Sequence, residues 1–137
     1  MRIVIIEDEL YAAKRLENMV KEYDPKIEIA AWLESVEESV EWFRENSEPD
    51  LIFLDIHLED NLSFAIFDKV SVSSPIVFTT ATDELAIKAF VTKGIDFLHK
   101  PIVKTELNAM LEKYLDPSKD FRKPIGAGFF SDIFDNK

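Results

Sequence analysis

Residues 51–55 read Leu-Ile-Phe-Leu-Asp, an apolar run that ends in a carboxylate. A short run of this kind between polar stretches is typical of a strand buried on both faces of a parallel sheet. Open α/β sheets place their chemistry at the carboxyl ends of the strands, so Asp55 is expected to project from that edge. This position makes Asp55 the first candidate for a functional residue.

Three more apolar runs end in polar residues in the same way. Glu7 and Asp8 follow residues 3–6, Thr79 and Thr80 follow residues 76–78, and Lys100 and Pro101 follow residues 97–99. If the four runs are parallel neighbours, three acids, a hydroxyl and an ammonium meet at one edge of the sheet. Such a group suits a divalent cation together with a phosphoryl group, because Mg²⁺ binds carboxylate and phosphate oxygens.

The stretches between these runs are amphipathic, which predicts βα units around a parallel sheet. We expect a further strand over residues 27–32, and helices over about residues 9–23, 36–43, 64–70, 84–94 and 105–115. Ser35 and Asp83 are the expected caps of the second and fourth helices. Residues 1–115 are therefore predicted to form one three-layer α/β domain.

Residues 116–137 lack a long periodic pattern and contain two of the chain's three glycines, so they are expected to be a linker or C-terminal tail. Phe129, Phe130, Ile133 and Phe134 have roughly helical spacing. These side chains could pack on the domain, meet a partner or belong to a disordered tail. The sequence leaves the three alternatives open.

The composition restricts the partners and the compartment. With 27 Asp and Glu against 16 Lys and Arg, the formal net charge is −11, and the segment is not expected to bind nucleic acid by itself. The chain has no cysteine, which excludes disulfides and thiolate metal sites and agrees with a reducing cytoplasm. No segment resembles a signal peptide or a membrane span, so we expect a soluble, cytoplasmic chain without a membrane partner.

Enzymatic motifs are missing as well. Gly94 is the only glycine before residue 126, so the sequence has no glycine-rich phosphate-binding loop. No serine lies in a G-x-S-x-G motif, which leaves hydrolytic triads without support. An enzyme or cofactor-binding protein of similar architecture is therefore disfavoured.

The charged candidates have simpler structural interpretations. Glu7 and Asp8 could be only the acidic start of the first helix, favoured by the helix dipole. In the functional interpretation Asp8 and Asp55 bind a cation directly and Glu7 acts through water. Lys100 could be a structural ion-pair partner, although its ammonium also suits a phosphoryl oxygen.

The two threonines that follow residues 76–78 compete for one role. Thr80 offers a hydroxyl to a phosphoryl oxygen, and Ala81 leaves space beside it. Thr79 is the alternative, because side chains alternate along a strand and only one of the two faces the site. Thr80 could also be no more than a cap of the helix that follows.

Four motifs together resemble a response-regulator receiver domain, the phosphoacceptor part of two-component signalling. They are Ile-Glu-Asp-Glu at 6–9, Leu-Asp-Ile at 54–56, Thr-Ala at 80–81 and Lys-Pro at 100–101. Within that family the chain is most similar to the LytTR-type (LytR/AlgR) regulators. The resemblance implies a flavodoxin-like, doubly wound (βα)5 parallel sheet with strand order 2-1-3-4-5 over residues 1–115, and a signalling receiver with self-phosphorylation and dephosphorylation chemistry rather than an enzyme.

The resemblance also implies a role for each candidate. A sensor histidine kinase would transfer a phosphoryl group to Asp55 with help from Mg²⁺ and Lys100. Glu7, Asp8, Asp55 and the backbone carbonyl of His57 would hold the ion. Thr80 and Phe97 would form the switch pair, although Phe97 could equally be a core residue.

The implied partners extend beyond the kinase. Relatives often form homodimers on phosphorylation through a face that here includes Lys88, Lys93, Asp96 and Glu106. A LytTR-type DNA-binding domain, absent from residues 1–137, would give the output. The alternative to this signalling role is a protein-interaction module with the same fold but no phosphoryl chemistry.

Overall fold

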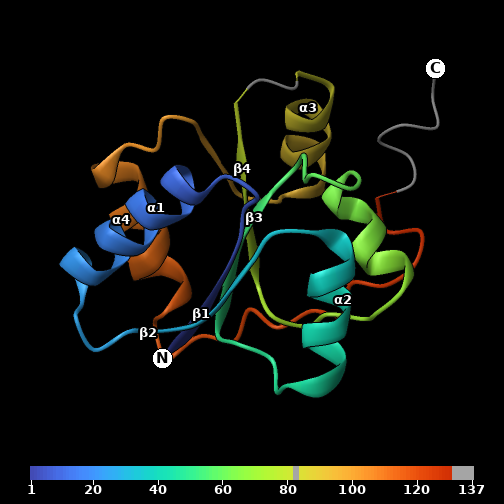
Figure 1. Cartoon of the computed structure of the whole chain (residues 1–137). Helices are drawn as coiled ribbons and strands as arrows, with labels where there is room; N and C mark the ends of the chain where they lie inside the picture. Colours follow the sequence, from blue (N-terminus) through green and yellow to red (C-terminus); the bar gives the residue numbers. More distant parts are fainter. Residues whose placement is uncertain (82–83, 131–137) are drawn as a thin grey trace.

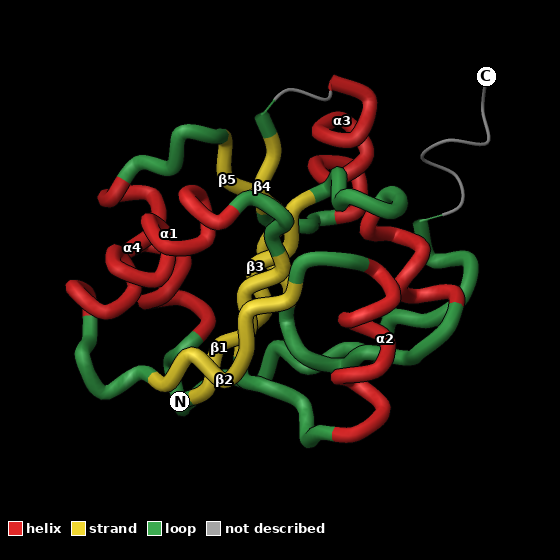
Figure 2. The backbone as a smooth tube through the Cα atoms, in the orientation of Figure 1, coloured by secondary structure: helices red, strands yellow, loops and turns green. Residues whose placement is uncertain are grey.

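A computed structural model describes residues 1–81 and 84–130. In this part of the chain five parallel strands form one sheet in the order β2-β1-β3-β4-β5 (Figure 2). The strands are β1 (Arg2–Ile6), β2 (Glu28–Leu33), β3 (Leu51–Asp55), β4 (Ile76–Thr80) and β5 (Phe97–His99). The predicted strand order and parallel sheet are therefore confirmed.

Helices cover both faces of this sheet (Figure 1). They are α1 (Leu10–Tyr23), α2 (Val36–Glu45), α3 (Glu84–Lys93), α4 (Lys104–Tyr114) and the 3-10 helix η1 (Ser63–Asp68). Helices α1 and α4 lie on one face, whereas α2, η1 and α3 lie on the other. The predicted three-layer architecture is confirmed, and none of the helices described has the length and apolar character needed to cross a membrane.

Alternation along the strands divides the core into two clusters. Ile5, Phe53 and Val77 point to the α1 and α4 side, where mostly aliphatic residues surround them. Leu54 and Phe78 point to the opposite side, where a cluster of aromatic rings fills the space between the sheet, η1 and α3. All residues of β3 and β4 are buried, as expected for strands covered on both faces.

Helix α2 begins at two caps, one of which the sequence predicted. The Ser35 hydroxyl accepts a hydrogen bond from the Glu38 N–H at 3.0 Å. The Asp60 carboxylate, from the loop after β3, accepts from the N–H groups of Val36 at 2.9 Å and Glu37 at 3.2 Å. The predicted cap Asp83 lies outside the described residues.

The helix expected around residues 64–70 is the 3-10 helix η1, which is shorter and tighter than an α-helix. In a 3-10 helix, residues three apart lie directly above one another. Phe64 and Phe67 are spaced in this way, and both rings contact the ring of Phe130. The spacing of the buried rings therefore suits the tighter helix.

The segment after α4 packs back onto the domain. Ile125 forms an antiparallel bridge with Val72, and Phe130 is buried in the aromatic cluster. Of the three alternatives for Phe129 and Phe130, the structure shows packing against the chain's own domain. Ile133 and Phe134 lie outside the described residues.

Candidate functional site

Three carboxylates meet at the carboxyl edge of the sheet, as the sequence predicts. Glu7 and Asp8 follow β1, and Asp55 is the last residue of the neighbouring β3. One oxygen of each carboxylate lies within 4.8 Å of the others. Glu7 and Asp55 are only 4% and 7% exposed, so their carboxylates have little contact with water.

Lys100 brings a positive charge to these acids from the end of β5. Its Nζ donates to Oε1 of Glu7 and, at 2.9 Å, to Oδ2 of Asp55. The backbone N–H of Lys100 donates to the carbonyl of Thr80 at 2.8 Å, which holds the residue against the end of β4. Lys100 thus forms a structural ion pair with Glu7 and Asp55. The same contact places its ammonium beside any group that was attached to the Asp55 carboxylate.

The electrostatics of the cluster favour a cation. Burial and the charge of Asp55 raise the pKa of Glu7 against the opposing effect of Lys100. Burial, together with the hydrogen bond and charge of Glu7, raises the pKa of Asp8. Burial opposes the charged form of Lys100, but the hydrogen bonds and charges of Glu7 and Asp55 outweigh it and raise its pKa. Three carboxylates and one ammonium leave two excess negative charges (3 − 1 = 2), which a divalent cation would neutralise.

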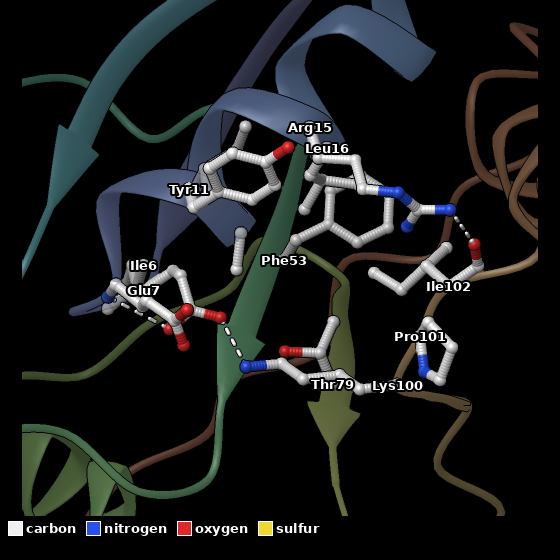
Figure 3. A pocket seen from close by; sticks show the side chains of 13 residues that line it. Ile6, Glu7, Tyr11, Arg15, Leu16, Phe53, Thr79, Lys100, Pro101 and Ile102 are labelled. Carbon is white, nitrogen blue, oxygen red and sulfur yellow. Dashed lines mark hydrogen bonds and ion pairs between the residues drawn. The ribbon is translucent and has the colours of Figure 1, made fainter.

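The two threonines at the end of β4 lie in different surroundings. Thr79 pairs with Asp55 across the sheet, and its side chain lines a cavity beside Lys100 (Figure 3). Thr80 is 1% exposed, and its hydroxyl has no hydrogen-bond partner among residues 1–81 and 84–130. A buried hydroxyl without a partner is unfavourable, so a group that formed a hydrogen bond with Thr80 would stabilise it.

Phe97 and His57 border the site without joining the carboxylates. Phe97 is half-buried on β5, and its ring lies 6.0 Å from that of Phe90. His57 has an exposed side chain, and its backbone N–H lies 3.4 Å from Oδ1 of Asp55. The backbone of His57 is therefore close to the acids, while its imidazole is on the surface.

A cavity of about 310 Å³ opens beside the acids and was not anticipated from the sequence. Figure 3 shows it between α1, the ends of β3 and β4, and the segment after β5. Apolar side chains such as Leu16 and Phe53 line it, and Arg15 closes one side by donating to the carbonyl of Ile102 at 2.9 Å. Tyr11, in the first turn of α1 beside the cavity, is 80% exposed, and nothing in the sequence analysis pointed to it.

The fold and the site define a class of molecule: a doubly wound α/β domain with buried acids and one lysine at its carboxyl edge. Residues 3–112 match the model of the response regulator receiver domain family. The chain therefore belongs to that family, the receiver domains of two-component response regulators.

Similar proteins indicate which branch of the receiver family the chain resembles. The chain is 34% identical over 116 residues to the sensory transduction protein LytT of Enterococcus faecalis, covering 82% of this chain and 47% of the relative. It is 32% identical over 123 residues to LytT of Bacillus subtilis, covering 88% and 50%. These matches confirm the LytTR-type resemblance, and the chain spans about half the length of the curated relatives it matches.

Solved structures agree with this assignment. The response regulatory domain of mrkE from Klebsiella pneumoniae matches with a TM-score of 0.71 at 26% identity, over 84% of this chain and 95% of that one. A two-component response regulator from Clostridium difficile matches with a TM-score of 0.71 at 25% identity, over 88% and 99%. The similarity to the second structure covers nearly its whole length, as expected for a shared receiver fold.

Proposed function

We propose that Asp55 is the phosphoacceptor of this receiver domain and that a sensor histidine kinase is its phosphodonor. One observation carries the proposal: Asp55 Oδ2 lies 2.9 Å from the Lys100 ammonium, within the only cluster of three potential metal-ligand residues among those that the structure describes. Asp55 therefore has the Lys100 ammonium on one side and a candidate site for a metal ion on the other. These are the groups that phosphoryl transfer needs, since its transition state is stabilised by positioning and charge.

The transfer requires little more from the chain than this arrangement. An oxygen of the ionised Asp55 carboxylate attacks phosphorus and forms a P–O bond. The bond from phosphorus to the donor histidine nitrogen breaks, and its electron pair stays on that nitrogen. Lys100 donates to an oxygen of the arriving phosphoryl group, and water later hydrolyses the acyl phosphate to the carboxylate and inorganic phosphate.

The acids fit a magnesium ion. Their oxygens lie within 4.8 Å of one another, and the raised pKa values of Glu7 and Asp8 mean that their negative charges are poorly compensated without one. Asp8, Asp55 and the backbone carbonyl of His57 would hold the ion, with Glu7 acting through water. The bound ion would supply positive charge to the oxygens of the phosphoryl group.

Thr80 and Phe97 are the proposed switch pair. The Thr80 hydroxyl is buried without a partner among the described residues, so moving toward a phosphoryl oxygen would give it one. Phe97 is half-buried against Phe90 and would turn further inward as Thr80 moves. This change at the end of β4 and β5 would carry the signal from Asp55 to the surface.

The wider setting follows from the same proposal. The kinase would deliver its phosphoryl group in the cytoplasm, and the segment itself would contact neither nucleic acid nor membrane. Phosphorylation would favour a homodimer, and a LytTR-type DNA-binding domain elsewhere in the protein would control transcription. Asp96, part of the suggested dimer face, already binds Lys113 at 2.7 Å within the chain, so that contact would have to be kept or exchanged.

Intact-mass measurement after incubation with Mg²⁺ and a small phosphodonor tests the proposal. The wild-type chain should gain one phosphoryl group, and Asp55→Asn should gain none. Asp68→Asn is the matched control, because Asp68 is an exposed carboxylate on η1 away from the acids, and it should behave as wild type. An unmodified wild-type chain, or equal modification of Asp55→Asn, would rule out Asp55 as the acceptor.

A further inference from the structure

Phe130 fills a groove formed by elements far from it in the sequence. It is 5% exposed, and its ring stacks on Phe64 with centroids 4.8 Å apart and an interplanar angle of 26°. It also contacts Phe67 at 5.3 Å and Phe78 at 5.6 Å. The three partner rings lie inside residues 3–112, which match the receiver family, whereas Phe130 lies outside them. The receiver part thus presents an aromatic groove that a later segment occupies.

Residues 123–130, here called the latch, reach this groove by a defined route. The N–H and carbonyl groups of Val72 and Ile125 exchange hydrogen bonds of 2.9 and 2.8 Å, and the Lys123 N–H donates to Ser73 at 3.0 Å. Figure 1 shows the chain crossing from the end of α4 to the side of the sheet that carries η1. The Lys93 ammonium lies 5.1 Å from the ring centroid of Phe129, which adds a contact to α3.

Open hollows of the surface border the latch on both sides. A cavity of about 310 Å³ lies between it and η1, and one of about 220 Å³ lies between it and the edge formed by β4 and the end of α3. Gly128 adopts a φ of 84°, in the left-handed region that favours glycine, where the latch turns toward the groove. These features suit a segment that can leave and return.

Ring contacts connect the latch to the proposed switch. Phe130 contacts Phe78, Phe78 stacks on Phe90 with centroids 4.6 Å apart, and Phe90 lies 6.0 Å from Phe97. Phe78 also lies two residues before Thr80 on β4. A movement of Thr80 and Phe97 therefore acts on the rings that hold Phe130.

We propose that the latch is an intramolecular ligand of the aromatic groove and that phosphorylation of Asp55 releases it. The coupling rests on the proposed function, in which Phe97 turns inward. Turning inward adds ring volume to a packed cluster, and overpacking is unfavourable. Among the buried phenylalanines of this cluster in the described residues, Phe130 alone lies outside a helix or strand, so it is the one displaced. Coupling between two equilibria is reciprocal: if phosphorylation weakens docking of the latch, then weakening the docking by removing the Phe130 ring favours the phosphorylated state.

Amide hydrogen exchange of Ile125, measured by NMR in the full chain, reports the latch, because that N–H is bonded only when the latch is docked. Phe130→Ala, and the milder Phe130→Leu, should speed this exchange by about tenfold or more. Adding Mg²⁺ and beryllofluoride, a phosphoryl mimic, should speed it in the unmutated chain. The exchange of Ile5 in β1 serves as the internal reference for global unfolding.

Phe43→Ala is the matched control, because it removes a ring that packs on the same cluster from α2 and whose ring contact among the described residues is with Trp42. It should leave the exchange of Ile125 relative to Ile5 unchanged. Unchanged Ile125 exchange in both Phe130 variants would overturn the docking. Beryllofluoride that binds without speeding Ile125 exchange, or that binds the Phe130→Ala chain no more tightly, would overturn the coupling alone. A chain that does not bind beryllofluoride would overturn the coupling and the proposed function together, while the variants still decide the docking.

Discussion

The two faces of the sheet are completed by different parts of the chain. On the side of α1 and α4, the cluster consists mainly of aliphatic side chains from residues 3–111, with Phe53 as the one ring that is fully buried there among the described residues. On the side of η1 and α3, five phenylalanines of the described part of the chain are buried, and one of them, Phe130, comes from beyond helix α4. The first face is closed by helices that bury a continuous stripe. The second has a short 3-10 helix and depends on an added segment for its last ring.

The largest expected effect is a difference in the free energy of unfolding between variants that remove a core ring, Phe53, and a latch ring, Phe130. Phe53→Ala should lower the free energy of unfolding by about 3–5 kcal/mol, because it empties a fully buried position between β1 and β4. Phe130→Ala should cost only about 1–3 kcal/mol, because Phe130 lies on a segment beyond helix α4 that can undock while the rest of the domain stays folded. Urea unfolding followed by circular dichroism measures both values.

If Phe53→Ala and Phe130→Ala lowered the free energy of unfolding equally, Phe130 would be an ordinary core residue and the two faces would not differ in this respect. The m-value adds a second criterion. If the latch is a local element, Phe130→Ala should leave the slope of unfolding nearly unchanged, because the surface exposed on unfolding is dominated by the rest of the domain.

The sequence rules worked where the signal is local. Each strand near the site is a short apolar run that ends in a candidate site residue, so the sequence placed Asp55 and Lys100 at one edge, where the structure also has them. The pairing of Phe130 with Phe64 could not be anticipated in the same way, because the rings are separated by most of the second half of the chain and share no period. For the same reason Ser35 was recognised as a cap of α2 and Asp60 was not.

The second expected effect is a pH dependence of stability caused by Glu7 and Asp8. These acids lie at the carboxyl edge of the sheet, which borders both faces. In the metal-free chain the raised pKa values of Glu7 and Asp8 mean that the folded state holds protons more tightly than the unfolded state. Stability should therefore fall as the pH rises from about 4, the ordinary range of these carboxyls, through their raised values. Mg²⁺ should remove this loss, since the ion favours the ionised carboxylates.

Unfolding midpoints measured in urea across this pH range, with and without Mg²⁺, test the second effect, and carboxylate NMR titration assigns it to residues. The expected result is a falling midpoint without the ion and a flatter one with it. Ordinary titration of both carboxyls in the metal-free chain would mean that the acids are less crowded than the structure indicates.

The smallest effect is at the loop that joins the acid edge to the η1 side. Asp60→Ala removes the carboxylate that accepts from Val36 and Glu37 and should cost about 1 kcal/mol of stability. The neighbouring exposed acid in Glu59→Ala serves as the control and should change little. Burial opposes ionisation of Asp60, but the N–H groups of Val36 and Glu37 outweigh it and lower its pKa. Its contribution is therefore complete above about pH 4 and is lost as the pH falls through the lowered value, so the two chains should converge in stability in acid. A difference that persists unchanged at low pH would show that the cap does not act through the carboxylate charge.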